Sequence, residues 1–207
     1  MNILCCGAHP DDIELMAGGT ISRLVAEGHN VIGVVFTNGT WTKPNGELAR
    51  DAKIAVRENY EVARFLNYKL LFFDEPSMDI QFCDRLVVRI LKIIEENTID
   101  TLILPWQEDV HKDHQIVAQI GIAASRRVSR VLQGQVNYFL HNFFTPNFFF
   151  DISDYFDNKI NALKLYQSVW KDSANDWTEF LNASHSYYGK MLGTKMAEGF
   201  ITYKYLF

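Results

Sequence analysis

Two short clusters of histidine and aspartate, about a hundred residues apart, carry the chemistry in this chain. Residues 7–14 spell GAHPDDIE, and residues 111–114 spell HKDH. Two imidazoles and a carboxylate are a common ligand set for a catalytic zinc ion that keeps one position open for water. A second carboxylate beside the first is a candidate general base for that water. These residue types therefore predict a metal site made in two pieces.

Taken singly, each cluster has a structural alternative. Asp11 or Asp12 could cap a helix that begins near Ile13, and the histidine pair at 111–114 could lie in a solvated loop. Both clusters, however, follow short apolar segments: the first comes directly after residues 3–6, and the second comes shortly after residues 101–105. The carboxyl ends of neighbouring parallel strands meet at one edge of a sheet. We therefore expect the two clusters to form one joint site.

Length and composition predict a single domain over residues 1–207, because 48% of the residues are hydrophobic and can fill one core. The net charge of −5, without any run of lysine or arginine, argues against nucleic acid or an anionic membrane as partner. No leader-like start and no apolar run of ~18 residues is found, which predicts a cytoplasmic protein without a membrane span. The three cysteines, Cys5, Cys6 and Cys83, are interpreted as buried thiols in a reducing compartment.

Apolar segments alternate with amphipathic ones along the first two thirds of the chain. This order predicts an α/β, Rossmann-like fold with a mainly parallel sheet, helices on both faces, right-handed crossovers and a helical C-terminal third. The polar stretch 38–46 is expected to be a rim loop. Strands are expected at residues 3–6, 31–37, 70–73, 101–104 and 136–144, and helices at 13–27, 48–66, 84–96, after His114, from 152 and at 177–191.

Dinucleotide binding is the competing hypothesis for a strand followed by a glycine-containing turn. It requires G-x-G-x-x-G at the turn, where the backbone approaches a pyrophosphate. Here the turn holds residues 9–12, and Gly18 and Gly19 fall inside the expected helix. Two carboxylates at a helix N-terminus would repel a phosphate, so we expect a cation there.

At these residues the chain resembles the PIG-L or LmbE-like family of zinc-dependent N-deacetylases, which remove an acetyl group from N-acetylglucosamine joined to another group. The resemblance covers nearly the whole chain. Its specific parts are the A-H-P-D-D-x-E element at 8–14 and the H-x-D-H element at 111–114, with supporting matches at 146–153 and 197–200.

The resemblance implies that one zinc ion per chain is bound by His9, Asp12 and His114, and that Asp11 is the general base. His111 would face the developing oxyanion, in its protonated form, or protonate the leaving amine. The implied substrate is a small-molecule N-acetylated sugar or sugar conjugate.

Other positions are implied less directly. Arg50 matches a family arginine that contacts substrate, whereas Met196 stands where some relatives have a tyrosine near the site. From its place between the two histidines, Asp113 is expected to orient an imidazole through His111 Nδ1. Glu14 is expected either to support the first cluster in the same way or to stabilise the helix N-terminus.

Two alternatives to a sugar N-deacetylase remain open at this point. One is a zinc amidase acting on a larger thiol or sugar conjugate, and the other is an inactive, metal-retaining carbohydrate-binding protein. Asp11 and His111 argue against the latter, because a binding site needs neither base nor acid. The aromatic residues Trp41, Trp106 and His141 suit stacking on a sugar ring or a contact in a homo-oligomer.

Overall fold

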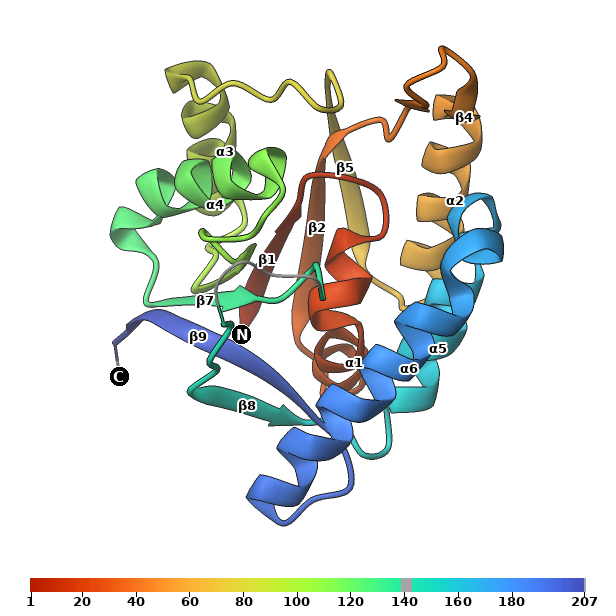
Figure 1. Cartoon of the computed structure of the whole chain (residues 1–207). Helices are drawn as coiled ribbons and strands as arrows, with labels where there is room; N and C mark the ends of the chain where they lie inside the picture. Colours follow the sequence, from red (N-terminus) through yellow and green to blue (C-terminus); the bar gives the residue numbers. More distant parts are fainter. Residues whose placement is uncertain (139–142, 207) are drawn as a thin grey trace.

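A seven-stranded sheet forms the centre of the computed structural model, which describes residues 1–138 and 143–206 except for the side chains of 171–176 (Figure 1). The strand order is β5-β2-β1-β6-β7-β9-β8, and the first five strands are parallel. β9 is antiparallel to both of its neighbours. The strands are β1 (Asn2–Gly7), β2 (Asn30–Thr37), β5 (Lys69–Glu75), β6 (Thr101–Pro105), β7 (Arg130–Gly134), β8 (Phe148–Asp151) and β9 (Ala197–Tyr205), with a separate hairpin of β3 (Trp41–Thr42) and β4 (Leu48–Arg50).

Helices cover both faces of the sheet (Figure 1). Side chains alternate between the faces along each buried strand, so that Ile3 and Cys5 join one apolar core while Leu4 and Cys6 join the other. The first core packs beneath α1 (Asp12–Ala26), α2 (Ala52–Phe65), α5 (Phe156–Lys164) and α6 (Gln167–Leu192), and the second beneath α3 (Asp84–Glu96) and α4 (Lys112–Ala124).

The predicted fold class is confirmed, but several boundaries differ. The strand expected at 136–144 is wrong, because β7 lies earlier, at Arg130–Gly134, and the described part of 136–144 is not strand. Residues 139–142, and with them His141, lie outside the described residues. Aromatic residues favour strands only where they also pack in a sheet, so their density alone misplaced the element. Strands β8 and β9 were not expected.

The helix expected from residue 48 begins only at Ala52. Asp51 sets this start, because its side chain accepts the backbone N–H groups of Lys53 and Ile54 as an N-cap. The preceding residues instead form β4. Within the described part of the chain, no helix combines the length and the apolarity needed to cross a bilayer.

A buried ion pair fixes helix α1 in place. Lys159 Nζ on α5 lies 2.6 Å from Glu198 Oε1 on β9, and it also donates to the carbonyl of Leu15 at 2.7 Å. Glu198 in turn accepts the backbone N–H groups of Gly19 and Thr20 on α1. α1 begins with Asp12, so this pair positions the first histidine-aspartate cluster against the rest of the chain.

Replacing Glu198 with alanine should therefore strongly destabilise the protein. The change leaves the Lys159 ammonium buried and unpaired, and we expect the free energy of unfolding in urea to fall by about 3–5 kcal/mol. The matched control is Glu47→Ala, which breaks an exposed pair with Lys43 and should cost less than about 1 kcal/mol. Equal losses in the two variants would contradict this role.

Candidate active site

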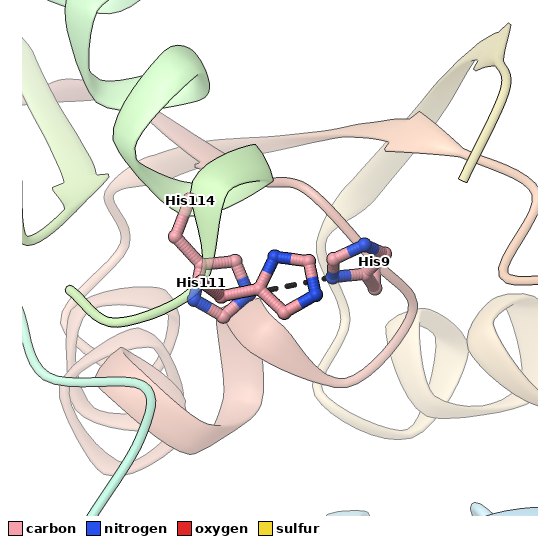
Figure 2. A group of neighbouring side chains, drawn as sticks. All are labelled: His9, His111 and His114. Atoms are coloured by element: carbon pink, nitrogen blue, oxygen red, sulfur yellow. Dashed lines mark hydrogen bonds between the residues drawn. The ribbon is translucent and has the colours of Figure 1, made fainter. Parts of the chain in front are cut away.

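The two sequence clusters meet at the point where the strand order of the sheet reverses. β1 pairs with β2 on one side and with β6 on the other, so the loops that follow β1 and β6 lie next to each other. Open α/β sheets bind their ligands in the crevice at such a point. Figure 2 shows the outcome: His9 from the first loop faces His111 and His114 from the second.

Three side chains bring potential ligand atoms together. His114 Nε2 lies 3.3 Å from His9 Nδ1 and 3.3 Å from Asp12 Oδ2, and His9 Nδ1 lies 3.6 Å from the same oxygen. Ligand atoms about 2.0–2.1 Å from a tetrahedral zinc ion are about 3.3 Å apart. The three sequence-predicted ligands therefore fit a small divalent cation.

Both of these imidazoles are oriented through their remaining nitrogen. His9 Nε2 donates to Asp113 Oδ2 at 3.0 Å, and His114 Nδ1 lies 3.1 Å from Asp109 Oδ1. Asp109 is itself held by the side-chain amide of Asn137 at 2.7 Å. A carboxylate behind each ring fixes the tautomer and directs the other nitrogen toward the shared centre, as in many metal sites.

The electrostatics favour positive charge at this centre. Burial opposes the protonation of His9, but the hydrogen bond to Asp113 and the nearby Asp12 outweigh it and raise the pKa of His9 to about 9. The same balance, with Asp12 and Asp109 outweighing burial, raises the pKa of His114 to about 10. Burial also opposes ionisation of Asp12, yet His114 and His9 hold the pKa of Asp12 well below its usual range.

Asp12 also shapes the loop that carries His9. Its Oδ2 accepts the backbone N–H groups of Ala8 and His9, each at 2.8 Å. The first loop is thus folded around the carboxylate. This bonding differs from the helix cap considered as an alternative, because the N–H groups precede the helix rather than belong to its first turn.

Asp11 lies beside the cluster in an unusual backbone conformation. Its φ is 104°, a value that favours glycine and costs other residues about 1–3 kcal/mol. Arg50 Nη1 donates to Asp11 Oδ2 and to the carbonyl of Pro10, each at 3.2 Å. Burial raises the pKa of Asp11 to about 6, against the opposing effect of Arg50. A carboxylate with such a pKa suits proton transfer near neutral pH.

Arg50 is buried and its contacts lie within the protein. Besides Asp11, it bonds to Ser168 Oγ at 3.1 Å and lies 3.8 Å from Glu58. Arg50 thus supports the candidate base, but it also lines the groove that leads to the site, and its Nη2 has no hydrogen-bond partner among the described residues. The contact with substrate that the resemblance implies stays a prediction.

His111 differs from the other two histidines. Its ring stacks on His114 with centroids 4.7 Å apart, and its Nδ1 accepts the backbone N–H of Asp113. Burial and the neighbouring His9 and His114 lower the pKa of His111. Asp113 thus orients an imidazole as expected, but the ring that its carboxylate contacts is that of His9, and only its backbone N–H reaches His111 Nδ1. The expected contact of the carboxylate with His111 Nδ1 is wrong. In the neutral ring, Nε2 carries the proton and is available as a donor.

Two supporting residues were missed at the sequence level, Asp109 and Asn137. The sequence offered only a weak indication of their role: Asp109 precedes His111 in the same loop, whereas Asn137 lies in the loop after a different strand. Glu14 does not support the first cluster, since its carboxylate accepts the hydroxyl groups of Tyr68 at 2.6 Å and Tyr166 at 2.7 Å in the core. It does lie in the first turn of α1, so its effect on the helix N-terminus stays a prediction.

Comparison with known proteins identifies relatives over the whole chain. The family model PIG-L, described as GlcNAc-PI de-N-acetylase, matches residues 4–125. The diacetylchitobiose deacetylase of Thermococcus kodakarensis is 27% identical in an alignment that covers 95% of this chain and 81% of that protein.

Solved structures show the same fold. The conserved protein TT1542 from Thermus thermophilus superposes with a TM-score of 0.84 at 21% identity, covering 100% of this chain and 96% of that one. The N,N'-diacetylchitobiose deacetylase from Pyrococcus horikoshii, solved with an inhibitor, gives 0.82 at 23% identity and covers 97% and 83%.

The raised pKa values of His9 and His114 predict that cation binding releases protons. His9 Nδ1 and His114 Nε2 share one hydrogen bond in the metal-free protein, so at least one of these nitrogens carries a proton that must leave before both can bind a metal ion. Calorimetric titration of the metal-free protein with Zn²⁺, in buffers of different ionisation enthalpy, should give at least one proton released per ion at pH 7. The release should fall, and the affinity rise, as the pH approaches 9 to 10. Binding without proton release at pH 7 would contradict the assignment.

Proposed function

This chain belongs to the PIG-L family, and on that premise we propose that it is a metal-dependent hydrolase that removes an N-acetyl group from an N-acetylglucosamine-type sugar or sugar conjugate. One observation carries the proposal. His9 Nδ1, His114 Nε2 and Asp12 Oδ2 converge within 3.3–3.6 Å of one another, and a separate carboxylate, Asp11, lies next to them. A binding protein needs the first feature at most, whereas hydrolysis of an amide needs both.

His9, Asp12 and His114 would hold one zinc ion per chain. A divalent cation supplies a Lewis acid that polarises an amide carbonyl and makes water acidic near neutral pH. Asp109 and Asp113 keep the two imidazoles aimed at the centre. The protein's own part is therefore to hold three ligands at a tetrahedral spacing with little freedom to move.

Asp11 is the proposed general base. It takes a proton from the water molecule that attacks the acetyl carbon, and it can then pass this proton to the departing amine nitrogen. Arg50 keeps the carboxylate in place through two hydrogen bonds to residues 10 and 11. The raised pKa of Asp11, about 6, allows both halves of this transfer near neutral pH.

His111 is proposed to donate its Nε2–H to the carbonyl oxygen as that oxygen gains negative charge. The accepted bond at Nδ1 and the lowered pKa favour this neutral donor over an imidazolium acid. One such donor is worth about 3 kcal/mol of transition-state stabilisation. Of the two roles left open for His111, the geometry supports oxyanion binding.

The substrate class rests on the relatives and on the shape of the site. A groove of about 750 Å³ leads to the cluster and is lined by polar side chains together with Trp41, which suits a sugar. Acetate release from a panel of N-acetylated amino sugars, diacetylchitobiose and thiol glycosides tests the proposal. Turnover of only the larger conjugates would favour the amidase, and turnover of none would favour a binding protein.

His114→Ala should lose most of the bound zinc while the protein stays folded, because the two apolar cores lie elsewhere. Elemental analysis of the purified variant measures this. The control is His29→Ala, a histidine at the opposite end of β2 that should leave the zinc content unchanged. Full occupancy in the His114 variant would exclude it as a ligand.

Asp11→Asn should retain zinc and lose about two to four orders of magnitude in kcat. Asparagine keeps the shape of the side chain and tolerates the same backbone conformation, so the loss reports the missing base. Asp154→Asn, at an exposed position of the chain, serves as the matched control. Turnover by the Asp11 variant within tenfold of the parent would rule out the assignment.

A further inference from the structure

Two cavities, and not one, open onto the candidate centre. The wider one, of about 750 Å³, and a narrower one, of about 210 Å³, share four polar residues of the site as lining. The shared side chains are His9, Asp11, His111 and Asn137. A substrate whose reacting atom lies at the cluster can therefore extend into both cavities.

The narrower cavity is apolar. Away from the site residues it is walled by side chains of α1, α5, α6 and the segment after β7. The one hydroxyl among them, that of Tyr166, already donates to Glu14 and so leaves only its ring for a ligand. The wall consists of Leu15, Val136, Leu163, Tyr166, Val169, Trp170 and Trp177, of which Val169 also lines the wider cavity.

The wider groove is more polar than the narrow cavity, although Leu48, Met78 and Val169 also line it. Its lining includes Thr40, Lys43, Glu47 and Ser77, along with the indole of Trp41, which is 48% exposed. Hydroxyl, ammonium and carboxylate groups beside an exposed aromatic ring are the usual partners of a polyhydroxylated ligand.

An amide has two substituents, the acyl chain on its carbon and the amine part on its nitrogen. With the carbonyl at the cluster, the two cavities offer a separate space for each substituent. We propose that the narrow cavity is an acyl-chain site, and that the protein hydrolyses N-acyl sugars with straight chains longer than acetyl. This inference rests on the proposed function and adds to it a substrate class.

The size of the cavity supports a chain longer than acetyl. A volume of about 210 Å³ is several times the ~30 Å³ that one water molecule occupies in the liquid. A methyl group, about as large as a water molecule, would leave most of this apolar space empty. With room kept for the attacking water and the cation, a chain of about four carbons fills it.

The chemistry is unchanged by chain length. The oxygen of water forms a bond to the acyl carbon, the C–N bond breaks, and the products are a fatty acid and a free amine. One proton of the water goes through Asp11 to the amine nitrogen. No oxidant, reductant or second substrate is needed.

The test is a series of acetyl, propionyl, butyryl and hexanoyl amides of glucosamine, with amine release as the readout. Each methylene buried in the cavity should raise kcat/KM by up to about fourfold, the factor equivalent to ~0.8 kcal/mol. A butyryl value at or above the acetyl value supports the acyl site. A butyryl value below the acetyl value overturns it and leaves the deacetylase proposal standing, whereas turnover of no member overturns both.

Two variants place the effect in the narrow cavity. Val136→Phe reduces its volume and should lower the butyryl-to-acetyl ratio of kcat/KM at least tenfold, whereas Trp41→Ala, in the wide groove, should leave that ratio unchanged. Should Val136→Phe fail to fold, Trp170→Ala enlarges the cavity and should move the optimum toward hexanoyl. An unchanged ratio in Val136→Phe, or an unchanged optimum in Trp170→Ala, would contradict the proposal.

Discussion

The parallel pairing of β1 with β6 is the constraint on which the site depends. Both strands are completely or almost completely buried, and their register places Ile3 beside Thr101 and Cys5 beside Ile103. This register brings the carboxyl ends of the two strands to the same edge of the sheet. Since His9 follows one strand and His111 the other, a shift of this pairing by two residues would move the two loops apart by about 7 Å.

The buried charged residues behind the site orient its side chains, and they contribute little to the stability of the fold. Asp109, Asp113 and Arg50 each face a residue of the cluster, and removing such groups from water is expensive unless each one finds a partner. An apolar replacement could pack as well, but it could not select a tautomer of His9 or hold Asp11. The apolar cores on the two faces of the sheet supply the stability that offsets this cost.

The two cavities and the cluster are built from different elements of the fold. One is walled largely by helices of the C-terminal third, α5 and α6, and the other by the hairpin of β3 and β4 and the loop after β5. The cluster itself is built on the parallel strands. Changes in these outer elements can therefore alter which molecule is accepted without disturbing the chemistry, which is how one fold serves many substrates.

The sequence by itself determined the parallel sheet and the two clusters, because buried strands are continuous apolar runs and each cluster follows such a run, the first directly and the second after five residues. Local signals of this kind need no knowledge of the tertiary structure. It could not place β7, β8 or β9, since these strands owe their structure to pairing with segments distant in the chain: β7 pairs with β6 and β9, and β8 pairs with β9. Likewise the sequence could not assign Asp113 to His9, because that contact joins residues 104 positions apart and only the packing of the two loops creates it. It could not identify Asn137 either, because the contact of Asn137 with Asp109 exists only where two separate loops meet.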